Sequence, residues 1–282
     1  MKRTGLLLIC FFIFQATGFS QFFEIGGFMG VSNYAGDLTP NAYVSKEYNM
    51  AMGLVARYNM MHNLSFKASF IKGAISGTDE HSTVYSGRRI RNLSFQSDIY
   101  ELSLQAEFNI IGYDVLENIT QLSPYLLAGI STFYFNPRAY YDNRWHELQP
   151  LGTEGQGLDG YGKKYSRVQI AIPMGIGMKV SITEKANLAF EAGFRKTFTD
   201  YLDDVSTAYP NPDDLAEVSN LTAKLSYRMD EYDPTLNIDP TNGTRGNPDH
   251  KDWYMFTGMT FTFNLGMNSV GTRPIPRGRP IF

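Results

Sequence analysis

The sequence is almost without cysteine, because its single cysteine, Cys10, lies within an apolar N-terminal run. Residues 1–3 are positively charged, residues 5–14 are apolar, and small residues at positions 18 and 20 favour cleavage before Gln21, so we expect a signal peptide over residues 1–20. Ile9, which precedes Cys10, is not the small residue that a lipoprotein site requires. A mature chain without cysteine excludes disulfides, thiolate metal sites and thiol nucleophiles.

Two further features are missing after position 20. The sequence contains no run of 18 apolar residues, which excludes a transmembrane helix. It has no marked excess of charge of one sign either, since the formal net charge is -3, which argues against a nucleic-acid partner. The sequence is instead rich in tyrosine, phenylalanine and glycine, with 18 Tyr, 20 Phe and 26 Gly. This composition is typical of strands and tight turns.

Apolar and polar residues alternate with a period of two along most of the chain. The clearest segment is 95–110, where Leu102 and Leu104 lie on one face and Glu101, Ser103 and Gln105 on the other. A strand separates these two sets, whereas a helix would mix them around its circumference. The predicted strands cover residues 22–32, 50–59, 64–70, 95–110, 124–135, 168–180, 188–195 and 253–264. Segment 124–135 is apolar on both faces, so its orientation stays open.

The connections between these strands alternate in length. Short or moderate ones cover 61–63, 111–123 and 183–186, and long polar ones cover 33–49, 77–94, 136–166 and 200–252. Short periplasmic turns and long extracellular loops are typical of outer-membrane barrels. We therefore predict an all-β fold: an eight-stranded antiparallel transmembrane β-barrel over residues 21–266, followed by a basic, proline-rich tail over 267–282, with both termini in the periplasm. The structural alternative is a soluble, lipocalin-like barrel with the two faces exchanged.

Pro173 does not suit an interior strand of a closed barrel, because it lacks the N–H that the ladder uses. With Gly175 and Gly177 close by, we expect a bulge or kink at this point.

If the polar faces point inward, the lumen contains charges of both signs in equal number. The predicted lumen charge network consists of Glu24, Arg57, Lys67, Glu101, Glu107, Lys179, Glu191 and Arg195. An eight-stranded barrel is only wide enough for side chains to fill it, and buried charges must be paired. The matched numbers indicate a closed, salt-bridged interior rather than a conduit.

Other polar groups give no comparable pattern. His81, His146 and His250 fall in separate predicted loops, so no catalytic residue is predicted. Two acidic pairs, Asp203 with Asp204 and Asp213 with Asp214, could hold calcium, but they lack the regular spacing of a calcium loop, and a solvated acidic loop is the simpler interpretation. The sequence predicts no cofactor, no metal, no small-molecule substrate and no enzymatic activity.

Several loop motifs resemble those of PorG-like barrels of Bacteroidota. They are residues 30–38 (GVSNYAGDL), 91–95 (RNLSF), 148–157 (LQPLGTEGQG) and 195–206 (RKTFTDYLDDVS). The resemblance spans nearly all of the mature chain. It implies a component of the type IX secretion system, associated with periplasmic ring proteins beneath the outer membrane.

Two function classes follow. One is a non-catalytic structural or assembly component that docks periplasmic ring partners, and the other is a stand-alone barrel enzyme or small-solute channel. For the first class, the candidate partner contact is the tail with Arg273, Arg277 and Arg279, since its prolines hold the guanidinium groups extended. A continuous water path, or a rim histidine beside a carboxylate, would favour the second.

Overall fold

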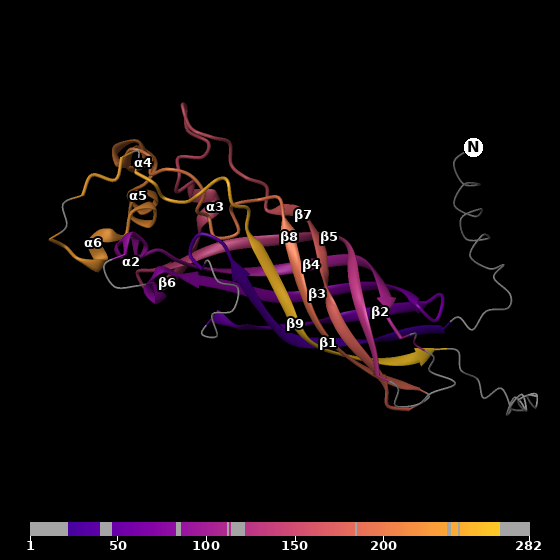
Figure 1. Cartoon of the computed structure of the whole chain (residues 1–282). Coiled ribbons are helices and arrows are strands. Elements are labelled where there is room, and N and C mark those ends of the chain that lie inside the picture. The colour runs from indigo at the N-terminus through magenta and orange to yellow at the C-terminus, as the bar shows by residue number, and fades with distance from the viewer. Residues whose placement is uncertain are drawn as a thin grey trace, which may run out of the picture.

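The computed structural model describes residues 22–39, 47–82, 86–111, 113, 122–183, 185–235, 238–241 and 243–265. Within these residues, long tilted strands form one barrel, and the helices gather with the long loops at one of its ends (Figure 1). The strands are β1 (Phe22–Ala35), β2 (Asn49–Asn59), β3 (Leu64–Thr78), β4 (Ser94–Asn109), β5 (Leu122–Tyr141), β6 (Arg144–Glu147), β7 (Val168–Ser181), β8 (Ala186–Thr197) and β9 (Trp253–Leu265).

Eight strands of the described chain close into an antiparallel ring. Their order is β4-β3-β2-β1-β9-β8-β7-β5, and the pairing of β4 with β5 completes the circle. Closure satisfies every strand edge, because each strand has a hydrogen-bonded neighbour on both sides. The predicted fold class is confirmed.

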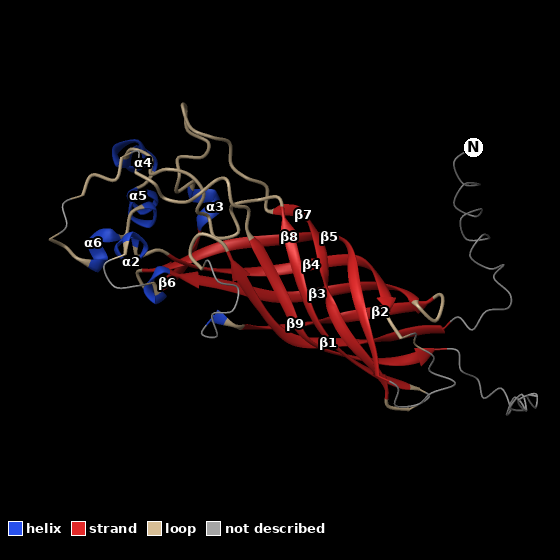
Figure 2. Ribbon diagram, in the orientation of Figure 1, coloured by secondary structure: helices blue, strands red, loops and turns tan. Residues whose placement is uncertain are grey.

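The two ends of the barrel differ in the length of their connections (Figure 2). At one end β2 is followed by β3, β4 by β5 and β7 by β8, and the start of β1 and the end of β9 lie there too, since Phe23 pairs with Leu265. The opposite end has the described parts of the other connections, residues 36–39, 47–48, 79–82, 86–93, 142–167, 198–235, 238–241 and 243–252. We call the elements gathered there the cap. Its helices are η2 (Asp79–His81), α2 (Gly87–Arg91), α3 (Leu148–Leu151), α4 (Pro212–Val218), α5 (Asn220–Ser226) and α6 (Met229–Tyr232).

None of the described helices is long or apolar enough to cross a membrane.

Several strands are longer than predicted at the cap end. β5 continues to Tyr141 and folds back as a hairpin with β6, through Asp142 and Asn143 at φ 48° and 60°. Two successive residues of this left-handed conformation match the twist of a two-residue hairpin turn, and Asp and Asn are among the residues that tolerate it.

The alternation along each strand sorts side chains between lumen and outer surface. On β4, Leu102 and Leu104 are 56% and 63% exposed, whereas Glu101 and Ser103 are at most 1% exposed. The apolar faces therefore point outward, which excludes the lipocalin-like assignment. The open orientation of 124–135 is also resolved, because Tyr125, Leu127 and Phe133 point inward.

The predicted bulge at Pro173 is wrong. β7 keeps one register with β5 on both sides of the proline, from Met174 opposite Ala128 to Ala171 opposite Ser131, and only the pairs at positions 172 and 173 are missing. The ladder with β8 runs through Pro173 without interruption. Each residue in a strand directs its N–H to one neighbour only, so the proline costs a local gap on one side rather than a bulge.

The lumen is not polar throughout. Toward the cap, inward positions carry apolar side chains, which continue into the buried side chains of the loops. We call this cluster the apolar plug; it contains Phe28, Val55, Ile71, Ile75, Ile99, Phe133, Phe135, Tyr254 and Phe256 from the strands and Leu38, Leu93, Leu148, Leu202, Val205 and Leu225 from the cap. The plug joins barrel and cap through one continuous hydrophobic core.

Candidate functional site: the barrel lumen and the cap

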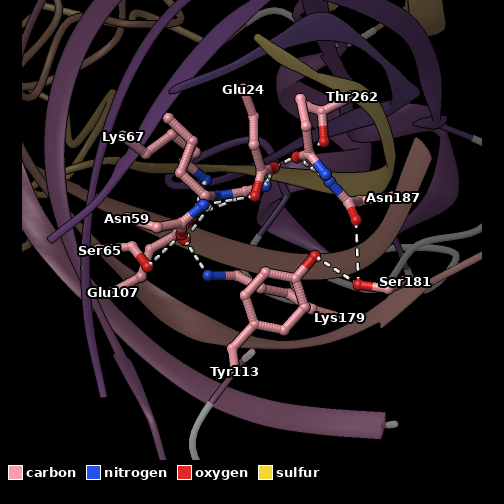
Figure 3. Close-up of polar contacts among 12 residues, drawn as sticks. Glu24, Asn59, Ser65, Lys67, Glu107, Tyr113, Lys179, Ser181, Asn187 and Thr262 are labelled. Atoms are coloured by element: carbon pink, nitrogen blue, oxygen red, sulfur yellow. Dashed lines mark hydrogen bonds and ion pairs between the residues drawn. The ribbon is translucent and has the colours of Figure 1, made fainter. Parts of the chain in front are cut away.

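Glu107 is the centre of a buried network near the short-turn end of the barrel. Its carboxylate lies 2.8 Å from Arg57 Nε, 2.5 Å from Lys179 Nζ and 3.5 Å from Lys67 Nζ. These cations come from β2, β7 and β3. Figure 3 shows Lys67 and Lys179 approaching Glu107 of β4 within the barrel. One carboxylate thus links strands from opposite walls.

Two more carboxylates complete this network. Glu24 accepts hydrogen bonds from Arg57 Nη1 at 2.6 Å, Asn59 Nδ2 at 2.6 Å and Thr262 Oγ1 at 2.7 Å. Glu191 pairs with Lys67 and accepts a hydrogen bond from the Tyr125 hydroxyl at 3.1 Å. We call these six charged residues, Glu24, Arg57, Lys67, Glu107, Lys179 and Glu191, the lower network.

The remaining two predicted lumen charges form a separate pair. Arg195 donates to Glu101 through Nε at 3.1 Å and Nη2 at 3.2 Å, and Tyr254 donates to the same carboxylate at 2.6 Å. The guanidinium carbon of Arg195 lies 4.7 Å from the centre of the Phe256 ring. This pair is therefore embedded in the apolar plug, where a planar guanidinium can both form two hydrogen bonds and stack on an aromatic ring.

The structure thus brings all eight predicted lumen charges into ion pairs inside the barrel. The lower network contains three cations and three anions, and the upper pair contains one of each, so each group is balanced on its own. None of the eight residues is more than 6% exposed. A continuous water-filled channel would leave such side chains accessible, so their burial indicates a sealed lumen.

A second set of buried polar groups lies in the cap. Asp203 accepts hydrogen bonds from the Tyr34 hydroxyl at 2.5 Å and Val205 N at 2.9 Å, and Asp252 accepts one from Leu202 N at 2.9 Å. Asp204 accepts hydrogen bonds from Thr153 and, at 2.7 Å, from Tyr165. The expectation of a solvated acidic loop at Asp203 and Asp204 is wrong, because both are at most 1% exposed and their hydrogen bonds fold the loop over the barrel mouth.

Burial changes the protonation of these cap carboxyls. It raises the pKa of Asp200 to about 7 and that of Asp204 to about 6. Burial also raises the pKa of Asp203 and of Asp252, and the nearby carboxylates add to the effect. The charged form of each group is disfavoured because water is replaced by a medium of lower dielectric constant.

Two arginines connect segments of the cap that are distant in sequence. Arg91 forms hydrogen bonds to Asp79 at 2.8 and 2.7 Å and to the carbonyl oxygen of Asp37 at 3.1 Å. Arg245 donates to Glu154 at 2.9 Å and to the Asp204 carbonyl oxygen at 2.6 Å. These contacts were not predicted, because pairs between different loops, such as Arg245 and Glu154 at 91 positions apart, leave no periodic signal in one sequence.

The histidines lie apart from one another in their contacts. His81 Nδ1 is 3.0 Å from Glu47, while His146 contacts the Tyr141 carbonyl oxygen at 3.2 Å. Thr39 donates to the other oxygen of Glu47 at 2.6 Å. His81 and Glu47 are thus a rim histidine beside a carboxylate, the feature that would favour a barrel enzyme. The carboxylate, however, stands between the hydroxyl and the imidazole, and this is not the order in which a histidine activates a nucleophile. Among the described residues, no group of three or more His, Cys, Asp or Glu side chains is arranged to hold a metal ion.

The candidate partner contact, Arg273, Arg277 and Arg279, lies outside the described residues, as do the predicted signal peptide and the rest of the tail.

Comparisons with known proteins identify a family and several similar structures. A family model described as a domain of unknown function, DUF6089, matches residues 2–229. No curated protein matches the chain significantly. Among solved structures, the chain is similar to Ail, the attachment invasion locus protein of Yersinia pestis, in complex with the heparin analogue sucrose octasulfate, at 8% identity and TM-score 0.40, over 88% of this chain and 100% of Ail. It is also similar to Neisserial surface protein A, at 8% identity and TM-score 0.41, over 86% and 96%, and to the outer membrane protein OprG of Pseudomonas aeruginosa, at 10% identity and TM-score 0.37, over 86% and 95%.

Proposed function

The chain belongs to the DUF6089 family of unknown function, and from this premise we propose that it is a non-catalytic outer-membrane barrel that acts as a structural component of a type IX protein secretion machine. In this role the barrel docks periplasmic ring proteins. The role rests on the resemblance of the loop motifs to PorG-like barrels, and the physical features below support it.

The outer surface supports a place in a membrane. Large apolar side chains cover the outward face of every long strand, among them Leu54 at 70%, Leu104 at 63% and Ile176 at 61% exposure. A soluble monomer does not expose a continuous apolar surface of this extent. In a bilayer these side chains contact hydrocarbon chains, which are equally apolar, and so they are not exposed to water.

The sealed lumen is the observation that carries the non-conducting, structural role. The eight lumen charges are paired and at most 6% exposed, and the apolar plug, in which the Glu101–Arg195 pair is embedded, lies between the lower network and the cap. A small-solute channel needs a continuous water-filled path along the barrel axis. A barrel whose interior is filled is instead suited to present its two ends to other proteins.

The short-turn end is the proposed docking end. The start of β1 and the end of β9 lie there, so the segment after Leu265 begins at that end. In the proposed orientation this end faces the periplasm, and Arg273, Arg277 and Arg279 offer positive charge to ring proteins.

Affinity purification from the native outer membrane tests the docking role. We expect the tagged full chain to retain periplasmic ring proteins, and deletion of residues 268–282 to reduce their recovery, more strongly at higher salt, where exposed charges are screened. Replacing the three arginines by glutamine should have the same effect, whereas replacing them by lysine should preserve much of the recovery.

Two results would count against the proposal. Full recovery of ring partners by the truncated barrel would move the contact away from the tail. Absence of any secretion component from the full-length eluate would remove the proposed role itself.

A further inference from the structure

Two buried carboxyl groups of the cap share one tyrosine hydroxyl. The Tyr34 hydroxyl donates to Asp203 Oδ2 at 2.5 Å, and Asp252 Oδ1 lies 3.4 Å from the same phenolic oxygen. None of these three residues is more than 1% exposed. We call Tyr34, Asp203 and Asp252 the triad. It joins the end of β1, the loop after β8 and the residue before β9 at the barrel mouth.

One oxygen of the triad has no hydrogen atom to accept if both carboxyl groups are ionised. Both oxygens of Asp203 accept hydrogen bonds, one from Tyr34 and one from Val205 N at 2.9 Å. Asp252 Oδ2 accepts from Leu202 N at 2.9 Å. The remaining oxygen, Asp252 Oδ1, faces the phenolic oxygen, whose only hydrogen already points at Asp203. A proton on Asp252 Oδ1 completes a chain in which Asp252 donates to Tyr34 and Tyr34 donates to Asp203.

The surrounding charges offer little compensation for two carboxylates. In the described part of the chain, neither Asp203 nor Asp252 forms a salt bridge. Arg91 favours the charged form of Asp203, whereas Asp37 and Asp200 disfavour the charged form of Asp252. Burial raises the pKa of both carboxyl groups, and the nearby charge of Asp203 raises that of Asp252 further. Two carboxyl groups this close in a medium of low dielectric constant do not both ionise readily.

The triad holds the loop after β8 against the apolar plug. Leu202 and Val205, whose backbone N–H groups bind the two carboxyl groups, are 0% and 2% exposed and belong to the plug. The segment after β1 covers the triad, since a Cβ atom at Gly36 would lie 2.0 Å from Asp252 Oδ1 and 2.1 Å from the Tyr34 hydroxyl oxygen. A second negative charge at this contact therefore repels segments that lie directly against each other.

From this geometry we infer that Asp252 carries a proton in the closed cap, and that loss of this proton releases the loop after β8 from the barrel mouth. The triad then acts as a proton-controlled latch of the cap. An unfolded aspartate loses its proton at about pH 4, so the closed cap holds a proton that the open cap gives up. Closure accordingly weakens as pH rises through the pKa of the closed state. The inference does not depend on the secretion role.

The carboxyl carbons of the triad report their protonation directly. The full barrel in lipid nanodiscs is labelled with ¹³C-aspartate, and Asp203→Asn and Asp252→Asn assign the two signals by their loss. At about pH 6, where an ordinary aspartate is ionised, Asp252 should have the chemical shift of a protonated carboxyl and Asp203 that of a carboxylate. Two ionised signals, or a proton on Asp203 instead of Asp252, would overturn the inference.

Hydrogen exchange at the Val205 amide measures release of the loop, because this amide binds Asp203, which Asp252→Asn leaves in place. Its protection, relative to the intrinsic exchange rate at each pH, should fall at least about tenfold from pH 5 to pH 8 in the wild type, since release of one proton contributes up to about a factor of ten per pH unit. Asp252→Asn cannot gain the second charge and its amide group can still donate to Tyr34, so it should retain most of the protection at pH 8.

Asp249→Asn is the matched control, because Asp249 is exposed and its loss should leave the wild-type profile unchanged. Gel migration before boiling establishes that the barrel of each variant is folded. Wild-type protection that does not fall with pH would overturn the inference without recourse to any variant. An Asp252→Asn profile equal to that of the wild type would assign the pH dependence to other cap carboxyls and would overturn the latch as well.

Discussion

Individual charged residues in the lumen are informative because their partners come from different strands. Glu107 contacts Arg57, Lys67 and Lys179, so a single carboxylate compensates parts of three buried cations. Removing one member of a buried ion pair destabilises a protein strongly, because the remaining charge stays buried without a partner. The lower network should therefore respond strongly to the loss of any one carboxylate.

We expect Glu107→Leu to lower the free energy of unfolding by about 3–5 kcal/mol, because it leaves buried cations without their shared partner. Urea unfolding of the refolded barrel in detergent micelles measures this change. The exposed carboxylate Glu217 in α4 provides the control, since Glu217→Leu leaves no buried charge behind. Equal, small effects of the two substitutions would show that the lumen charges are solvated rather than paired.

The cap carboxyls predict a dependence on pH. Burial raises the pKa of Asp200 to about 7 and of Asp204 to about 6, above the value near 4 of an unfolded aspartate. Between these values the folded cap holds more protons than the unfolded chain, so its stability falls as pH rises from about 4 to about 7 and levels off above. Proteolysis of segment 198–252 should accordingly be slower at pH 5 than at pH 8.

The substitution Asp200→Asn removes the carboxyl group whose pKa burial raises to about 7. The stability of the cap should then depend less on pH in the upper part of this range. Asp37 and Glu154 disfavour the charge at position 200 while Lys251 favours it, so the substitution removes a net unfavourable term. Asp249→Asn, at an exposed position, should keep the wild-type profile. A cap that is cleaved faster at pH 5 than at pH 8 would contradict the sign of the effect.

At the scale of the element, each strand has a defined inner and outer face. The register between β4 and its neighbours is continuous, so Leu104 and Glu101 keep opposite orientations along its length. If the barrel spans a membrane, a charged side chain at the middle of the outer face lies in lipid. A charged side chain outside the hydrocarbon layer does not.

Leu104→Arg should reduce the stability of the inserted barrel by about 2–4 kcal/mol if the side chain lies near the bilayer midplane. Phe190→Arg, on the outer face of β8, should behave in the same way. Tyr140→Arg tests the boundary, because Tyr140 is exposed in the hairpin of β5 and β6 and should tolerate the change. The measurement is the fraction of chain that inserts into liposomes; unimpaired insertion of all three variants would contradict the assignment of the lipid-facing surface.

At the scale of the whole molecule, ring closure links every strand to two others. No strand of the ring can leave without breaking two ladders, and the pairing of β4 with β5 connects the two halves of the sheet. The apolar plug adds contacts between the ring and the cap. Such a structure should open cooperatively and slowly.

The folded chain should therefore resist detergent and migrate on gels at a different apparent mass until it is boiled, since each strand of the ring is hydrogen-bonded to two neighbours. Circular dichroism of the unboiled sample should be dominated by strand. Identical migration before and after boiling, together with a helical spectrum, would exclude the closed barrel.

The sequence by itself determined the strands, their inner and outer faces and the alternation of short and long connections. It could do so because strand periodicity is local: Leu104 and Glu101 reveal opposite faces from their spacing alone. The same alternation identified the eight lumen charges, since each is a polar residue at an inward position. Local rules failed where a segment is apolar on both faces, as at 124–135, and where a missing N–H at Pro173 could be absorbed without a bulge.

Only the tertiary structure decided which charges meet, where the lumen turns apolar, and how the cap closes over it. Arg57 meets Glu107, 50 positions away, through the curvature of a closed sheet, whereas Tyr34 meets Asp203, 169 positions away, because the loop after β8 folds over the barrel mouth. The cap depends on the same long-range folding, because Arg245 meets Glu154, 91 positions away. Contacts of this kind are set by ring closure and packing in three dimensions, and a one-dimensional pattern carries no record of them.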